Sequence, residues 1–146
     1  MKSIKLMLAT ALLAGFSLTS CSDDDGGSST GGNIVGKWTP TKTVTSVDGR
    51  NVTSNYDQNE AGCDKDYTEF VTGGQVREVV FFKNASSVCT EDAQTGSTWS
   101  KAETTLIIDS QSYEITRLTG SELRIKSTVS TGGATLSVTE YYNRVK

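Results

Sequence analysis

Short runs of Val, Ile, Thr, Phe and Tyr, separated by clusters of Gly, Asn, Asp and Ser, occupy the chain from Ile34 to its end. Runs of β-branched and aromatic residues are typical of strands, and the intervening clusters are typical of turns. No segment of this region shows the 3.6-residue period of apolar residues that an amphipathic helix requires. The pattern therefore predicts an all-β fold.

Several segments have the composition of strands, and we expect the shorter ones to merge into about eight strands. They are residues 35–47, 67–71, 76–83, 86–90, 97–100, 104–109, 112–118, 122–130 and 135–145. Tight turns such as Gly73-Gly74 and Gly132-Gly133 favour antiparallel pairing of consecutive strands. The sequence therefore predicts an antiparallel meander.

Two segments show how the strands divide their faces. In residues 122–130, Leu123, Ile125 and Val129 alternate with charged and polar residues, which predicts one packed and one wet face. Residues 79–82 are instead apolar at every position. Both faces of that strand need cover, and we expect a loop to lie over one of them.

The N-terminus has the features of an export signal. Lys2 and Lys5 precede an apolar segment, residues 6–18, which is shorter than the roughly 20 residues that span a bilayer. The motif Leu18-Thr19-Ser20-Cys21 resembles the lipobox of bacterial lipoproteins. The resemblance implies a signal peptide over residues 1–20 and lipid attached to Cys21, whereas the alternative is a buried N-terminal helix.

Residues 21–33 are expected to connect the lipid to the folded part of the protein. Residues 22–33 contain no apolar side chain, a composition typical of a flexible tether. The run Asp23-Asp24-Asp25 either solvates the tether or acts in sorting, since it resembles the surface-export signals of some Gram-negative lipoproteins. The length that remains, residues 34–146, suits one domain.

The cysteines indicate an oxidising compartment. If Cys21 carries lipid, Cys63 and Cys89 remain as an even pair, which favours a disulfide. Two buried free thiols are the alternative. A metal site is a poorer interpretation, because neither cysteine lies in a C-x-x-C motif and the chain has no histidine.

Charge and composition exclude several classes of function. Removing Lys2 and Lys5 with the signal peptide leaves 12 of the 14 basic residues against 17 acidic ones, a formal charge of −5. This balance argues against nucleic acid as a partner. Because no histidine is present, the usual general base and the Ser-His triad are missing, and we expect neither an enzyme nor a cofactor.

A resemblance to one family rests on the two ends of the β-rich region. Gly36-Lys37-Trp38 follows the tether directly, and Tyr141-Tyr142-Asn143-Arg144 ends the last predicted strand. With Thr98-Trp99 and the cysteine pair, these motifs resemble the lipocalin-like domain of bacterial lipoproteins over residues 34–146. The resemblance implies a single antiparallel, up-and-down, eight-stranded barrel.

The resemblance also assigns a structural pair. In lipocalins, the tryptophan of G-x-W closes one end of the barrel and a basic residue of the last strand lies across it. Trp38 and Arg144 match these positions and are expected to form the barrel floor. Pro40 departs from a regular strand, because proline removes a ladder donor, and predicts a bulge or an edge there.

The resemblance to a lipobox implies a lipid-anchored protein of the cell envelope, held through Cys21 at the outer membrane of a Gram-negative bacterium, either within the envelope or exposed at the surface. We expect a monomer whose barrel binds a small apolar or amphipathic ligand. The candidate pocket residues are Phe81, Phe82, Trp99, Tyr113, Leu123, Ile125, Tyr141 and Tyr142. The alternative is a non-enzymatic display module that binds a protein or a glycan through residues 48–66 and 90–96, which are expected to be loops.

Overall fold

The computed structural model describes residues 30–131 and 133–146. The predicted signal peptide, Cys21 and most of the predicted tether lie outside the described residues. Within the described ranges, no helix is long and apolar enough to cross a membrane. The strands there are β1 Gly36–Val47, β2 Arg50–Asn55, β3 Tyr67–Val71, β4 Gln75–Lys83, β5 Cys89–Ala102, β6 Thr105–Ile108, β7 Gln111–Leu118, β8 Glu122–Thr131 and β9 Ala134–Arg144.

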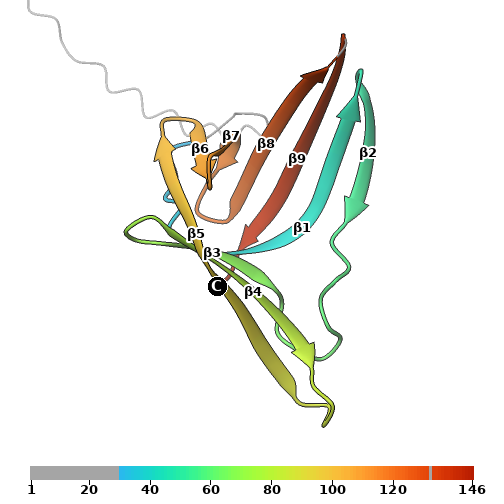
Figure 1. The fold of residues 1–146 in the computed structure, drawn as a ribbon, viewed down its shortest axis with the longest axis vertical. Helices are drawn as coiled ribbons and strands as arrows, with labels where there is room; N and C mark the ends of the chain where they lie inside the picture. Colours follow the sequence, from blue (N-terminus) through green and yellow to red (C-terminus); the bar gives the residue numbers. More distant parts are fainter. Residues whose placement is uncertain (1–29, 132) are drawn as a thin grey trace, which may run out of the picture.

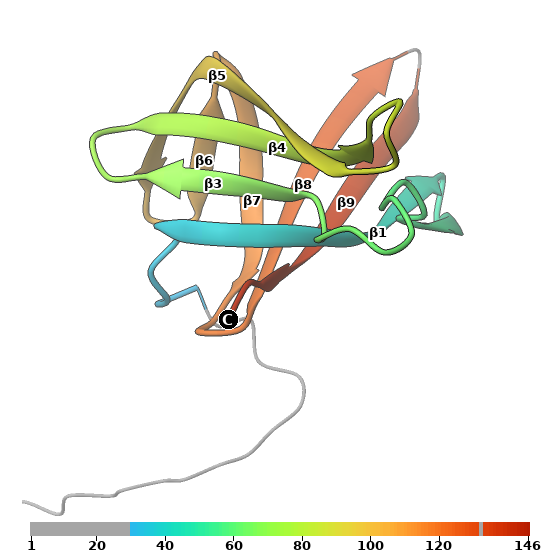
Figure 2. The same ribbon diagram turned by 90° about the horizontal axis from the view of Figure 1, so that it is seen from below.

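All of these strands except β2 close into one antiparallel barrel. The order of hydrogen-bonded neighbours is β1-β3-β4-β5-β6-β7-β8-β9, and β9 pairs back with β1. Figure 2 shows the ring that these strands form. The predicted all-β, eight-stranded up-and-down barrel is therefore confirmed.

β2 lies where the sequence predicts a loop, and that part of the prediction for residues 48–66 is wrong. It pairs with residues 42–47 of β1. Asp48 and Gly49 have φ angles of 48° and 82°, and a type I′ hairpin turn needs a positive φ at both central residues. Because every residue of β2 is exposed, no alternation of apolar and polar residues marks the strand.

The predicted loop at residues 90–96 is also wrong. β5 runs without a break from Cys89 to Ala102 and joins two of the predicted strand segments. Residues 89–95 pair with β4 in a largely exposed ribbon. Polar side chains there can remain in water on both faces of the ribbon, so the sequence carries no burial pattern.

β1 changes its neighbour at Pro40. Residues 36–38 pair with β3, whereas residues 42–47 pair with β2 on the same edge. The register with β9 shifts between Pro40 and Lys42. The predicted bulge is therefore confirmed, and it lies at the point where the barrel wall is interrupted.

Apolar side chains fill one end of the barrel. The fully buried members include Trp38, Leu106, Ile115, Leu118 and Leu123, each no more than 1% exposed. Phe70, Val76, Ile125 and Ile34 complete this cluster. This end of the barrel is therefore a packed core, as the tight packing of protein interiors requires.

Beyond the core, two ribbons extend from the barrel and diverge. Figure 1 shows the β4–β5 hairpin running to one side and β8, β9, β1 and β2 running to the other. Side chains alternate between the two faces along the whole length of each strand. The face that points into the barrel therefore becomes, farther along the same strand, the concave surface between the ribbons. The barrel is thus closed and packed at one end and widely open at the other.

Candidate functional site

The structure separates the predicted pocket residues into three groups and leaves Phe82 apart, exposed on the inner face. Leu123 and Ile125 belong to the packed core, at 0% and 3% exposure. Trp99, Tyr113 and Tyr142 are partly buried against that core. These five residues face the barrel interior, where the first two belong to the core and the last three pack against it.

Phe81 and Tyr141 lie on the outer face, away from the other candidates. Successive side chains of a strand point to opposite faces, so Phe82 and Tyr142 face inward while their neighbours face outward. The ring of Phe81 packs 6.2 Å from that of Tyr67. The Lys42 ammonium and the Arg124 guanidinium lie 4.6 Å and 5.0 Å from the Tyr141 ring centroid.

Acidic groups lie on the inner face just above the core. The Tyr142 hydroxyl donates a hydrogen bond to Glu140. Burial raises the pKa of Tyr142, and the carboxylates of Glu140 and Glu78 raise it further. Burial and the same two carboxylates also raise the pKa of Tyr113. Both hydroxyls therefore stay neutral near pH 7, and the two glutamates supply negative charge to this level of the barrel.

Exposed apolar side chains line the inner face of both ribbons above these acidic groups. In β4, Val80 is 45% exposed and Phe82 is 41% exposed. In the opposite ribbon, the exposed residues are Val47, Val52, Val129 and Leu136. Paired strand residues share a face, and the register aligns Val47, Leu136 and Val129. We call this set, with Val80 and Phe82, the inner apolar surface.

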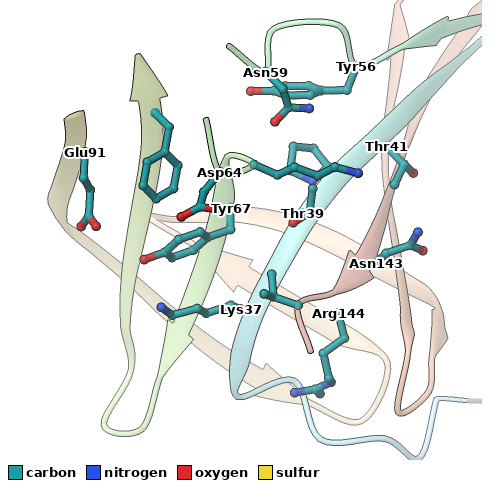
Figure 3. Close-up of a pocket in the computed structure, with 14 residues that line it drawn as sticks. Lys37, Thr39, Thr41, Tyr56, Asn59, Asp64, Tyr67, Glu91, Asn143 and Arg144 are labelled. Carbon is teal, nitrogen blue, oxygen red and sulfur yellow. The ribbon is translucent and has the colours of Figure 1, made fainter. Parts of the chain in front are cut away.

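A separate groove of about 820 Å³ lies on the outer side of the barrel wall. Figure 3 shows Tyr56 and Asn59 at one end of it and Lys37 and Arg144 toward the other. Its lining also includes Thr39, Pro40, Thr41, Asp64, Lys65, Tyr67, Phe81, Glu91 and Asn143. The groove borders β1 at the point where that strand changes its neighbour.

The segment of residues 56–66 forms one wall of this groove and covers the outer face of β4. Asp66 is only 3% exposed. Its carboxylate accepts hydrogen bonds from the Tyr56 hydroxyl at 2.6 Å and from the Phe81 backbone N–H at 2.8 Å. Val79, on the same face as Phe81, is 1% exposed. The expectation of a loop over residues 79–82 is therefore confirmed for the outer face.

A disulfide fastens the same segment to β5. Cys63 and Cys89 are bonded, with their Cα atoms 5.6 Å apart, so the predicted pair is confirmed. The Lys83 ammonium adds a hydrogen bond to the Ala61 carbonyl. The wall of the groove is thus held to β4 by the Asp66 contacts and to β5 by a covalent bond.

We expect the attachment of residues 56–66 to weaken at alkaline pH. Burial, reinforced by the hydrogen bond to Asp66, raises the pKa of Tyr56 from 10.0 to about 12. Its stabilising contribution is present below pH 10 and is lost as pH rises through about 12, because the folded state disfavours ionisation. Denaturant unfolding followed by circular dichroism should show this loss across that range.

Tyr56→Phe is the matched control for this pH dependence. The variant keeps the ring but removes the ionisable hydroxyl, so its unfolding free energy should fall less steeply above pH 10. Near pH 7 the variant should be about 1 kcal/mol less stable, because one hydrogen bond to a buried carboxylate is lost. An identical alkaline slope in both proteins would contradict the assignment.

The predicted floor pair lies at the closed end. The guanidinium carbon of Arg144 is 4.2 Å from the centroid of the Trp38 ring. The guanidinium also donates to the carbonyls of Val35 and Asn33, and the Trp38 indole N–H donates to the Ile34 carbonyl at 2.7 Å. These contacts bind the segment before β1 across the end of the barrel.

The described residues include no group of three or more His, Cys, Asp or Glu side chains able to hold a metal ion. The inner apolar surface offers apolar contact, and the outer groove offers hydrogen bonding and charge. The groove residues Tyr56 and Asn59 lie within residues 48–66, the binding segment of the alternative interpretation, but the sequence did not identify them individually. The feature of the sequence that could have pointed to them is Tyr56, an aromatic residue within a largely polar segment.

Comparison with known proteins agrees with this fold. No curated protein matches the chain. The model of the lipocalin-like domain family matches residues 34–125, more than half of the chain and most of the barrel. That barrel is a ligand-binding fold, suited to small hydrophobic ligands, and the family is generally non-enzymatic. With its G-x-W segment at the start of β1 and its closed barrel, this chain belongs to the lipocalin-like domain family.

Proposed function

We propose that this protein is a lipid-anchored lipoprotein of the cell envelope whose barrel binds a small apolar or amphipathic ligand at its open end. The inner apolar surface is the observation that carries the ligand proposal. Phe82 and Val80 face Val129 and Leu136 from opposite ribbons, and each is at least 40% exposed. The register places Val47, Leu136 and Val129 side by side on one ribbon, and an exposed apolar patch is typical of a binding site.

The ligand is expected to lie at the open end, because side chains already fill the closed end. Covering apolar surface is worth roughly 25 cal/mol per Å², which favours an alkyl chain along the two ribbons. The inward end of such a ligand would meet Glu78 and Glu140. Since carboxylates only accept hydrogen bonds, an amine or hydroxyl head group suits this end better than a carboxylate.

Replacing Phe82 with aspartate should weaken the binding of a single-chain amphiphile by at least tenfold. The substitution removes a large apolar contact and adds a charge on the inner apolar surface. Ile107→Asp is the matched control, since Ile107 and Phe82 are both 41% exposed but Ile107 points outward from β6. Binding can be followed by tryptophan fluorescence, with dodecylamine, dodecanol and dodecanoate below their micelle concentrations.

Dodecanoate should bind most weakly of the three, because its head group would lie beside two carboxylates. An equal loss of affinity in Phe82→Asp and Ile107→Asp would contradict the inner site, because it would reflect a general effect of added charge. Absence of saturable binding for all three probes would contradict the ligand proposal.

Anchoring depends on Cys21, which we propose is the lipidated residue. Replacing Cys21 with alanine should abolish palmitate labelling and move the protein out of the membrane fraction, because acyl chains contribute about 0.8 kcal/mol per buried methylene. Ser28→Ala, a change within the tether, should leave both measurements unaltered. Labelling that persists in the Cys21 variant would contradict the proposal.

A further inference from the structure

The outer groove exists because the barrel wall has a gap. On one edge of β1, residues 36–38 pair with β3 and residues 42–47 pair with β2. Thr39, Pro40 and Thr41 therefore lie opposite no strand on that edge. The hollow of about 820 Å³ at this gap falls within the roughly 300–1,000 Å³ that ligand sites usually occupy.

The walls of the groove are held in place without a ligand. The Tyr56 backbone N–H donates to the Thr41 carbonyl at 2.9 Å, and the Tyr56 hydroxyl is held by Asp66. The Asn59 side-chain oxygen accepts the Asp66 backbone N–H at 2.9 Å, which leaves its amide nitrogen to donate elsewhere. A site organised in advance loses little freedom when it binds.

The charged side chains that line the groove nearly cancel one another. Two cations, Lys37 and Lys65, lie with two anions, Asp64 and Glu91. Arg144 adds a third positive charge at the border of the groove, but its guanidinium already donates to main-chain carbonyls. This balance disfavours a ligand of strong net charge and suits one that both donates and accepts hydrogen bonds.

Neutral groups complete the lining. Asn59 and Asn143 supply amides, and the rings of Tyr56 and Phe81 supply apolar faces. A ligand that matches this lining carries many hydroxyls, little charge and patches of C–H surface. Those are the properties of a saccharide.

A peptide added as a strand fits the groove poorly. Strand addition needs alternating N–H donors and free carbonyls along an open edge. In the gap, Pro40 has no N–H, and the Thr41 carbonyl already accepts the Tyr56 N–H. The open edge therefore offers no ladder for an extended chain.

We propose that the outer groove between residues 56–66 and β1 is a second binding site, which takes a neutral oligosaccharide. Its lining shares no residue with the inner apolar surface, which lies on the opposite face of the barrel wall. The protein would then hold an apolar ligand on one side of that wall and a sugar chain on the other.

The test is calorimetric titration of the full chain, in detergent and with its disulfide formed, against hexasaccharides of glucose, mannose and N-acetylglucosamine. Saturable binding of at least one is expected. Asn143→Ala and Asp64→Ala should each weaken it about five- to tenfold, as the loss of one hydrogen bond predicts. Both side chains are exposed, and circular dichroism should show the fold retained.

Asn51→Ala is the matched control, because Asn51 is exposed on β2 and does not line the groove. It should leave the affinity unchanged. Three results would overturn the proposal: no saturable binding of any of the three sugars, equal affinity in the Asn143, Asp64 and parent proteins, or binding of a hexapeptide library at the groove in place of sugars. None of these outcomes depends on amphiphile binding at the inner surface.

Discussion

Replacing Trp38 with alanine is expected to lower the free energy of unfolding by about 3–5 kcal/mol, the cost of emptying a buried aromatic site. Trp38 is 0% exposed and lies at the closed end of the barrel. The substitution also leaves the Ile34 carbonyl without its indole donor and removes the ring beneath Arg144. Denaturant unfolding followed by circular dichroism measures the change.

Two further variants, Trp38→Phe and Ile107→Ala, show how much of the lost unfolding free energy comes from the hydrogen bond and how much from burial of the ring. The phenylalanine variant keeps an apolar ring but loses the hydrogen bond, so it should cost less than the alanine variant. Ile107 lies on the outer face and is 41% exposed, so its truncation should cost well under half as much as that of Trp38. A Trp38→Ala cost below about 1 kcal/mol would mean that the floor repacks around the cavity.

The second large effect is expected on removal of the disulfide. Cys63 and Cys89 are separated by 26 positions, and closing a loop of that length is worth roughly 3.5 kcal/mol in the chain-entropy model. For a domain of this size the melting temperature should fall by on the order of 10–20 °C. The Cys63→Ser, Cys89→Ser double variant, followed by thermal melting, measures this.

Reduction of the parent protein with dithiothreitol provides the control. It should reproduce the double variant, because both break the same link between residues 56–66 and β5. The double variant should itself be insensitive to the reductant. A parent melting temperature that does not change on reduction would contradict the prediction and would mean that the Asp66 contacts alone hold the segment.

Strands with one buried face were predictable, and strands exposed on both faces were not. Residues 122–130 alternate because one face packs in the core, and β8 forms there. β2 and residues 90–96 of β5 are polar on both faces, because they lie in ribbons that extend into solvent. Their strand character comes from hydrogen bonding to β1 and β4, which depends on the neighbouring strand rather than on their own side chains.

The residues of the candidate sites were likewise predictable where a local motif marks them and unpredictable where strand pairing positions them. The floor residues Trp38 and Arg144 could be named from a local motif at each end of the barrel. Phe81 and Tyr141 point outward because of the register in which their strands pair. A shift of one residue in that register would move each side chain to the opposite face. The outer groove depends on Tyr56, Asn59 and Asp66, whose contacts with β1 and β4 join segments far apart in the sequence.

The amino-acid sequence predicted the all-β class and the need to cover residues 79–82, it favoured the pairing of Cys63 with Cys89, and its resemblance to one family implied the eight-stranded barrel. These follow from local composition, from the count of cysteines and from motifs at the ends of the domain. Three features became visible only in the folded protein: the closed end is filled, two ribbons expose an apolar inner face, and a groove opens in the wall beside Pro40. Each of these depends on which strands become neighbours, and that is a property of the whole barrel that no single segment contains.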